Sequence, residues 1–189
     1  HPPVIEQQRQ CLLAGWQATL AAVDGDITAD VPDQLATLPS DATHLVVSVG
    51  GNDALGYAGV LTVPATTVNQ ALVELGQVRD TFRENYRAML RAVLQHQLPT
   101  AVCTIYDSVP GLGEPERLAL GMFNEVILRE AFTHGLPVID LRLVCDQAAD
   151  YSQLSPIEPS VHGGAKIAKV VATVVTSHDF NRRQTCIYR

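Results

Sequence analysis

The chain lacks several features that would place it in common protein classes. It has 13 Lys and Arg against 20 Asp and Glu, which gives a formal net charge of −7. No basic stripe is present to neutralise phosphates, and the only cationic cluster, Arg182-Arg183, is near the C-terminus. No apolar run approaches the ~20 residues that cross a bilayer. We therefore expect neither a nucleic-acid partner nor a membrane span.

The cysteines form no recognisable metal or redox motif. No CxxC and no Cys/His spacing typical of zinc is present among Cys11, Cys103, Cys145 and Cys186. Gly111-Leu112-Gly113 is too short for a phosphate-binding loop, so we expect no metal and no cofactor. Scattered free cysteines are typical of a reduced compartment, which favours the cytoplasm. The first residue is His1 rather than Met, which leaves a signal peptide an open question.

Apolar strands alternate with amphipathic helices along the whole chain. Its 189 residues suit one domain, and 47% hydrophobic against 17% charged residues is typical of a globular protein. The patterns predict strands at Trp16–Val23, Thr43–Val49, Thr100–Tyr106 and Leu136–Leu141. They predict helices at Val4–Ala14, Thr28–Leu38, Thr66–Gln97, Glu116–His134, Leu143–Tyr151 and Gly164–Ser177. The domain then covers residues 1–177, with a loop at Leu55–Val63 and a tail at His178–Arg189.

Three residues mark expected helix boundaries. Thr28 is a plausible cap of the helix Thr28–Leu38, and Gly76 is a candidate break in the helix Thr66–Gln97. Gly135 is expected to end the helix Glu116–His134. Strands that alternate with helices pair in parallel through right-handed crossovers. The expected fold is a three-layer α/β/α sandwich with a mostly parallel sheet, as in flavodoxin-like proteins.

Polar residues follow the predicted strands, at the edge where such sheets bind ligands. Asp24-Gly25, Gly50–Asp53, Asp107 and Asp140 all fall there. Acyl transfer forms a tetrahedral oxyanion that preorganised N–H donors stabilise. The Asn52 amide is one candidate donor, and Gly25 is a second because no Cβ blocks its backbone N–H. Asp53 is expected to brace this loop. The simpler alternative is that Gly50–Asp53 is only a turn.

Several segments resemble, in the same order, those of the SGNH or GDSL-type hydrolases. Asp24-Gly25 resembles the second block of that family, with Gly25 as its glycine. Gly50–Asp53 resembles the third, with Asn52 as its asparagine. Phe123–Arg142 resembles the helix and strand before the last block, and Ser155–Ala168 resembles the last block. The resemblance spans nearly the whole chain. It implies the SGNH fold and a serine esterase acting on a small acyl ester or an acetylated carbohydrate.

The family's nucleophile segment has no counterpart in the printed sequence. No Gly-Asp-Ser and no G-x-S-x-G elbow occurs, and Ser48 lies within an apolar strand. In the family the first strand lies between the second and third strands of the sheet. Without it, two strands would expose unpaired edges or would have to close on each other. We therefore expect the natural gene product to carry roughly 20–30 further residues upstream, enough for a strand and a loop at ~3.3 Å per residue.

The last block departs from the family pattern at its two reactive positions. Glu158 stands where the catalytic histidine belongs, and Ser155 stands where the aspartate belongs. A glutamate of ordinary pKa, near 4.3, is a poor base for a serine hydroxyl unless burial raises that pKa. His162 follows Glu158 by about one helical turn and is the alternative base, with Glu158 orienting it. The simpler alternative is an exposed histidine at the start of the helix.

Three functions follow from these observations. The leading hypothesis is an ester hydrolase in which Gly25 and Asn52 stabilise the oxyanion, Glu158 and His162 stand in for the base, and the serine lies outside the printed sequence. The second is a catalytically inactive relative that keeps the fold as a binding or scaffold domain. The third is an unrelated flavodoxin-type domain, which no phosphate site supports. The oligomeric state stays open.

Overall fold

The computed structural model describes residues 15–189, and the predicted helix Val4–Ala14 lies outside the described residues. Four parallel strands form one sheet in the order β1-β2-β3-β4. Their bounds are Leu45–Val47 for β1, Thr100–Cys103 for β2, Val138–Ile139 for β3 and Ile187–Tyr188 for β4. The parallel order confirms the predicted fold class.

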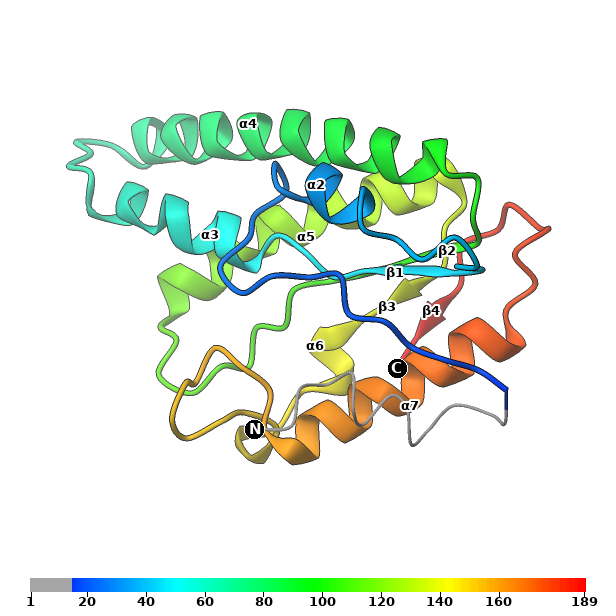
Figure 1. Ribbon diagram of the computed structural model, residues 1–189. Coiled ribbons are helices and arrows are strands. Elements are labelled where there is room, and N and C mark those ends of the chain that lie inside the picture. The colour runs from blue at the N-terminus through cyan, green and yellow to red at the C-terminus, as the bar shows by residue number, and fades with distance from the viewer. Residues whose placement is uncertain (1–14) are drawn as a thin grey trace.

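Helices cover both faces of this sheet (Figure 1). One face carries α2 (Val31–Leu35), α3 (Gly51–Tyr57), η1 (Ala58–Thr62), α4 (Val68–Gln95) and α5 (Glu114–His134). The opposite face carries α6 (Leu141–Val144), η2 (Ala148–Asp150) and α7 (Val161–Ser177). The molecule is therefore a three-layer α/β/α sandwich.

The alternation of side chains along the strands divides the core into two clusters. Val102 and Val138 pack with α4 and α5 on one face, whereas Cys103 and Ile139 pack with α7 on the other. Successive side chains of a strand point to opposite faces, so a continuous apolar run is what a sheet covered on both sides requires. This is why β1, β2 and β3 lie within apolar runs that the sequence predicts as strands.

The long helices form close to their predicted positions. Thr67 caps α4, its hydroxyl accepting a hydrogen bond from the Gln70 N–H at 3.1 Å. The helix then runs 28 residues without the break considered at Gly76. The predicted loop at Leu55–Val63 is wrong over most of its length, because α3 continues to Tyr57 and η1 follows it. Helix α5 ends at His134, and its C-cap residue Gly135 adopts φ +66°.

The predicted strand Trp16–Val23 is wrong, because this segment is irregular. Its Leu20 and Val23 side chains are exposed, and no described strand pairs with it. A strand needs a neighbour to satisfy its backbone N–H and C=O groups, which apolar composition alone does not provide. The segment 178–189, expected as a tail, contributes β4 to the sheet, where the Val138 N–H donates to the Cys186 carbonyl at 2.9 Å.

Among residues 15–189, none of the helices combines the length and apolar character that crossing a membrane requires.

Candidate functional site

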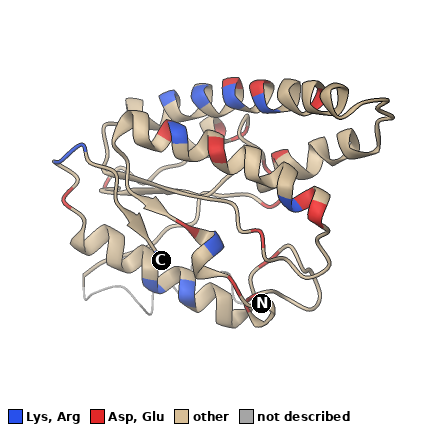
Figure 2. Cartoon of the chain, turned by 180° about the vertical axis from the view of Figure 1, so that it is seen from behind, with Lys and Arg blue, Asp and Glu red and all other residues tan. Residues whose placement is uncertain are grey.

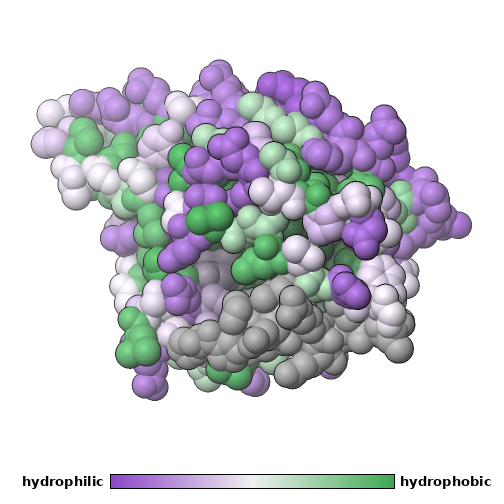
Figure 3. All heavy atoms as spheres, in the orientation of Figure 1, coloured by the Kyte–Doolittle hydropathy of each residue, from purple (hydrophilic) through white to green (hydrophobic). Residues whose placement is uncertain are grey.

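A large cavity of about 1180 Å³ lies between β1 and the irregular segment Trp16–Val23. Every residue from Leu45 to Asn52 lines one wall, and every residue from Trp16 to Asp24 lines another. Ile167 and Val171 of α7 line it from one side of the sheet, and Leu35 of α2 lines it from the other. The cavity therefore lies in the plane of the sheet and crosses all three layers. Figure 3 shows hydrophobic side chains around the hollow in this face.

Along this cavity β1 presents a free edge. The Leu45 N–H donates to the Pro99 carbonyl at 2.8 Å, on the side of β2. In a parallel ladder alternate residues bond to opposite neighbours, so Val46 and Ser48 turn their backbone groups toward the cavity. No described strand pairs with this edge. We refer to the part of the cavity beside this unpaired edge of β1 as the slot.

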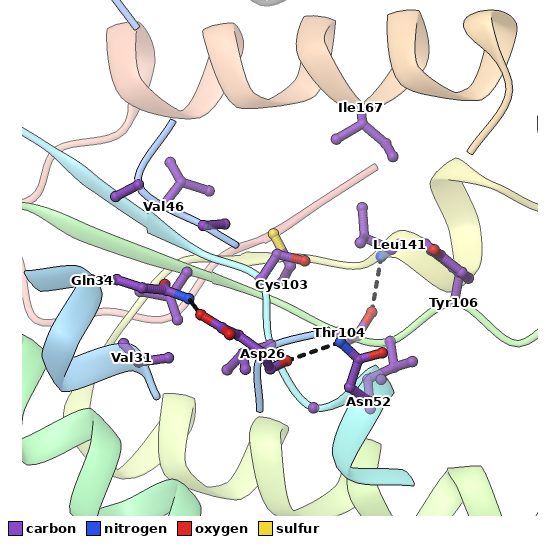
Figure 4. A pocket seen from close by; sticks show the side chains of 18 of the residues that line it. Asp26, Val31, Gln34, Val46, Asn52, Cys103, Thr104, Tyr106, Leu141 and Ile167 are labelled. Atoms are coloured by element: carbon purple, nitrogen blue, oxygen red, sulfur yellow. Dashed lines mark hydrogen bonds between the residues drawn. The ribbon is translucent and has the colours of Figure 1, made fainter. Parts of the chain in front are cut away.

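The turn after β1 is built by a glycine that no other residue replaces easily. Gly50 adopts φ +116°, and α3 begins at the next residue. A Cβ on Gly50 would lie 3.2 Å from side-chain atoms of both Ile105 and Phe82. The left-handed conformation and the close packing both favour glycine. This turn directs Asn52 into the cavity at the carboxyl end of β1 (Figure 4).

Asn52 is held by the loop that contains the second predicted oxyanion donor. Its Nδ2 atom donates a hydrogen bond to the Asp26 carbonyl at 2.9 Å, and the Asp26 carboxylate accepts one from Gln34 Nε2 at 2.8 Å (Figure 4). A primary amide carries two N–H groups, so one hydrogen of Asn52 stays available for a ligand. One N–H of the Asn52 amide thus fixes the side chain near the end of β1, and the other N–H can donate to a ligand.

Gly25 is next to this contact but does not line the cavity. It is exposed and adopts φ +86° in a turn closed by the Asp26 N–H donating to the Val23 carbonyl at 3.3 Å. Its neighbours Asp24 and Asp26 do line the cavity. The structure therefore brings the Gly25 turn close to Asn52, although Gly25 itself is not part of the cavity wall.

Asp53, in the first turn of α3, ties this helix to the loop that contains Thr28. Its carboxylate accepts hydrogen bonds from the Thr28 N–H at 3.1 Å and from the Thr28 hydroxyl at 2.6 Å. Asp53 is 5% exposed and Thr28 is 1% exposed. Charge-assisted bonds away from water are strong, so this pair fixes the loop against the helix that carries Asn52. The prediction that Thr28 caps α2 is wrong, because α2 begins at Val31 and the hydroxyl is used here.

The last block contributes two residues to the cavity wall. Ile157 and Pro159 line the cavity, whereas the Glu158 side chain is exposed and is not part of the wall. The Ser155 carbonyl accepts a hydrogen bond from the Glu158 N–H at 2.9 Å, so Ser155 belongs to the turn that shapes this loop. Tyr106 fixes the loop through a hydrogen bond from its hydroxyl to the Ile157 carbonyl at 2.5 Å.

His162 lies in the first turn of α7, because the helix begins at Val161. Its side chain is 68% exposed, and its Nε2 atom is 3.7 Å from Oδ1 of the fully buried Asp150. Asp150 also forms an ion pair with Lys166 at 2.8 Å and accepts the Gln147 N–H at 2.9 Å. The carboxylate near His162 is therefore Asp150 and not Glu158, and His162 does not line the cavity.

Two titratable groups of the cavity wall are unsuited to proton transfer near neutral pH. Burial raises the pKa of the Cys103 thiol to about 12, although a hydrogen bond with Ser48 opposes this shift. Burial, together with the nearby Cys145 and Glu158, raises the pKa of the Tyr106 hydroxyl to about 12. Both groups keep their protons, so neither is an activated nucleophile.

The described wall also contains no serine–histidine pair. Ser48 and His44 both line the cavity, but Ser48 follows His44 by four positions of extended chain, a span of about 13 Å. A nucleophile and its base must be within hydrogen-bond reach. Among residues 15–189 no group of three His, Cys, Asp or Glu side chains could hold a metal ion. The described part of the site thus offers a donor and a cavity but no nucleophile.

Asp140, predicted at a strand end, is committed to structure. Burial alone would raise its pKa, but hydrogen bonds from Arg142 and Thr104 outweigh burial, so the pKa is lower than usual. The Thr104 hydroxyl donates to Asp140 at 2.9 Å and accepts the Leu141 N–H at 2.9 Å. Asp107 is half-buried after β2 and does not line the cavity.

Sequence reasoning missed Asn124, which supports the site from α5. Its side chain accepts the Ile105 N–H at 2.8 Å and donates to the Ile105 carbonyl at 2.9 Å. Ile105 in turn packs against Gly50 at the start of the Asn52 turn. A lone polar residue at a buried helical position was the available signal, because such a group needs buried partners.

Comparisons with known proteins agree with this geometry. The model of the GDSL-like lipase/acylhydrolase family matches residues 3–167. The crystal structure of an extracellular lipase from Streptomyces rimosus superposes with a TM-score of 0.52 at 22% sequence identity. The match covers 81% of this chain and 76% of the lipase chain. No curated protein matches the sequence. The family model matches most of a chain that folds as a parallel α/β sandwich and places Gly51-Asn52-Asp53 in the first turn of α3, close after β1. The chain therefore belongs to the GDSL-like lipase/acylhydrolase family.

Proposed function

We propose that the protein is an ester hydrolase of the SGNH type in which Asn52 stabilises the oxyanion. The observation that supports this most directly is the position of the Asn52 amide, at the carboxyl end of β1 and beside the free edge of the sheet. Gly25 is the second donor in this proposal, which requires the turn at Val23–Asp26 to move so that Gly25 joins the cavity wall. A small acyl ester or an acetylated carbohydrate remains the substrate expected from the sequence.

The nucleophilic serine is proposed to come from a segment outside the printed sequence that occupies the slot beside β1. A strand parallel to β1 would bond to the backbone groups of Val46 and Ser48 and would end at the edge of the sheet where Asn52 lies. It would also cover the apolar wall formed by Leu35 and Ile167. The slot supports the expected upstream strand independently of where the printed sequence starts.

Glu158 and His162 stay the candidates for the base. Glu158 is supported by its neighbours Ile157 and Pro159, which line the cavity, and by its exposed side chain. His162 is supported by its neighbour Asp150, which can orient an imidazole as the acid of a triad does. Either role requires movement of the loop that the Tyr106 hydroxyl fixes.

The test is a fluorophosphonate reaction with the full-length natural protein, followed by mass spectrometry and assay of a short p-nitrophenyl ester. We expect one adduct on a serine upstream of the printed sequence. Asn52→Ala should lower kcat by roughly 10²–10³, the usual cost of losing an oxyanion donor. Asn181→Ala, in an exposed turn, is the matched control. Unchanged hydrolysis by Asn52→Ala would refute the role of Asn52.

A second function, a binding or scaffold domain without turnover, is favoured by one observation. The described wall of the cavity holds no nucleophile–base pair, and the Glu158 and His162 side chains are exposed. This function predicts ligand binding with neither a covalent adduct nor turnover in the same experiment.

A further inference from the structure

Three hydrogen bonds hold the backbone around Glu158. The carbonyl of the preceding residue, Ile157, accepts the hydroxyl of Tyr106 at 2.5 Å. The Glu158 N–H donates to the Ser155 carbonyl at 2.9 Å, and the Glu158 carbonyl accepts the Ser152 N–H at 2.8 Å. Three consecutive polar groups of the backbone are thus occupied, which fixes the point from which the Glu158 side chain extends.

The Glu158 side chain, by contrast, is uncommitted. It is exposed, and within residues 15–189 its carboxylate forms no hydrogen bond and no ion pair. The loops that follow β2 and α6, residues 104–113 and 145–160, contain no Lys or Arg that could pair with it. Figure 2 shows the Lys and Arg residues mainly on the helices and in the segment before β4. A fixed backbone with a free carboxylate is what a residue that acts on a ligand requires.

Tyr106 connects this carboxylate to the cavity. It lines the cavity wall (Figure 4), and its ring packs edge-on against the Tyr151 ring with a centroid distance of 5.3 Å. Tyr151 is 4% exposed, and its hydroxyl donates to the Cys145 carbonyl at 2.7 Å, so it is a rigid support. Besides burial and Cys145, the charge of Glu158 contributes to the raised pKa of the Tyr106 hydroxyl. Tyr106 is therefore a protonated donor in a fixed position, close enough to Glu158 for the two groups to interact.

The loop of residues 152–158, which we call the Glu158 loop, has a closed base and an exposed tip. A β-bridge between Tyr151 and Pro159 closes the base, and the Leu154 side chain at the tip is 90% exposed. Among the described residues outside this loop, Tyr106 is the one that forms a hydrogen bond with residues 153–158. The position of the Glu158 loop therefore depends on a single side-chain hydrogen bond.

A small shift of the Glu158 loop would exchange the acceptor of this bond. The Ile157 carbonyl and the Glu158 carboxylate belong to adjacent residues, about 3.3 Å apart along extended chain. The carboxylate is the stronger acceptor, because hydrogen bonds to charged groups are stronger than those to neutral carbonyls. After such a shift the Tyr106 hydroxyl would hold the Glu158 carboxylate at the cavity wall. His162 lies beyond the base of the loop, in α7, so the shift does not carry it.

We propose that Tyr106 is the positioning residue for Glu158, and that Glu158 rather than His162 is the base. The proposal rests on the ester hydrolase function proposed above and decides between its two candidate bases. In the resting loop the Tyr106 hydroxyl donates to the Ile157 carbonyl. In the working position it donates to one oxygen of the Glu158 carboxylate, which leaves the other oxygen to accept the proton of the nucleophilic serine. Tyr106 keeps its own proton throughout.

The first test is a double-mutant cycle on hydrolysis of p-nitrophenyl butanoate by the full-length natural protein. Tyr106→Phe should lower kcat about tenfold, the effect of one hydrogen bond to a charged group, and should change KM by less than about twofold because the ring stays in the wall. In a Glu158→Gln background the same change should lower kcat by less than about twofold, because residues that act as a unit are not additive. In a His162→Gln background the full tenfold loss should remain.

Tyr188→Phe is the matched control. It removes a hydroxyl that shares a hydrogen bond with Nδ1 of His178 at 2.9 Å, outside the cavity wall. We expect its kcat and KM to equal those of the natural protein.

The second test is hydrogen exchange followed by mass spectrometry, which does not depend on turnover. Tyr106→Phe should speed backbone exchange in peptides that cover residues 152–158 by about tenfold, because the loop loses its tie. Exchange in peptides from α7 should stay unchanged. Tyr188→Phe should leave the exchange of residues 152–158 as it is in the natural protein.

Three results would overturn the proposal while ester hydrolysis stands. One is an equal loss of kcat from Tyr106→Phe in the natural and Glu158→Gln backgrounds. Another is a loss that disappears in the His162→Gln background, which would make His162 the residue through which Tyr106 acts. The third is unchanged exchange of residues 152–158 in Tyr106→Phe. Absence of hydrolysis by the natural protein would refute the proposed function and the base role of Glu158 together, so the two failures are distinguishable.

Discussion

Replacing Asp53 tests how the site is held together. In Asp53→Ala the Thr28 N–H and hydroxyl both lose their acceptor, and both belong to a residue that is almost fully buried. A hydrogen bond to a charged group contributes about 1.5–3 kcal/mol, and a buried donor left unpaired retains its desolvation cost. Two such bonds, reduced by some relaxation of the loop, give an expected loss of about 3 kcal/mol in unfolding free energy.

A double-mutant cycle separates this contact from general damage to α3. Thr28→Val removes the hydroxyl and keeps the N–H, so we expect it to cost about 1–2 kcal/mol. The double variant should be less destabilised than the sum of the two, with a coupling of about 1 kcal/mol or more. Asp33→Ala, an exposed position in the first turn of α2, is the matched control and should change stability by less than about 0.5 kcal/mol.

Urea denaturation of the natural protein, the two single variants, the double variant and the Asp33→Ala control, followed by circular dichroism, supplies the measurement. The same proteins should be assayed for hydrolysis, because Asp53 holds the loop whose Asp26 carbonyl binds Asn52. We expect kcat to fall in Asp53→Ala even below its unfolding transition. A loss of under about 0.5 kcal/mol, or strictly additive effects in the cycle, would refute this account of the loop.

Substitutions at four further positions probe the fold. Burial lowers the pKa of His44 below 6.5, so the unfolded state binds more protons than the folded state as the pH falls through 6.5. The free energy of unfolding should therefore drop between pH 7.5 and 5. His44→Phe should weaken that drop, as measured by urea titrations at each pH. Asn124→Ala should cost about 2–3 kcal/mol, and Asn124→Asp should cost a similar amount because a carboxylate cannot donate to the Ile105 carbonyl. Gly135→Ala should destabilise the protein by at least about 1 kcal/mol, since φ is +66° and a Cβ would lie 2.7 Å from the Arg183 backbone. Gly76→Ala should stabilise it by about 0.5–1 kcal/mol in the same urea titrations, because Gly76 lies in mid-helix with open space around its Cα.

The layers of the fold could be predicted because each helix and strand carries its own periodic signal. For α4 the apolar spacing predicted Thr66–Gln97, and the helix spans Val68–Gln95. For α5 the prediction of Glu116–His134 is two residues short at the start, where Pro115 follows Glu114 in the first turn. Helical periodicity is local, so a single sequence is enough to reveal it.

Strand formation at Trp16–Val23 could not be predicted in the same way. The segment has the composition of a strand, but a strand is completed by the neighbour to which it bonds. In the structure the cavity separates it from β1. The short β4 shows the converse, because Ile187 and Tyr188 have little periodic signal and become a strand through pairing with β3.

For the site, local geometry was predictable and long-range pairing was not. The Gly50–Asp53 turn follows from a strand that runs into glycines, and Gly50 does adopt a positive φ. The partner of Asp53 is 25 residues away in sequence, and no spacing rule identifies Thr28. For the same reason the sequence paired His162 with Glu158 four residues earlier, whereas the structure brings the more distant Asp150 to it.

The slot beside β1 connects the stability of the proposed enzyme to its activity. A segment placed there would bond to the edge of β1 and cover apolar residues from both faces, so it would stabilise the sheet. Because parallel strands end at the same edge, the end of that segment would lie next to Asn52, where the nucleophile is needed. One segment would therefore carry both roles. Removing only a serine hydroxyl from it should abolish turnover at nearly constant stability, whereas weakening its apolar contacts should lower both together.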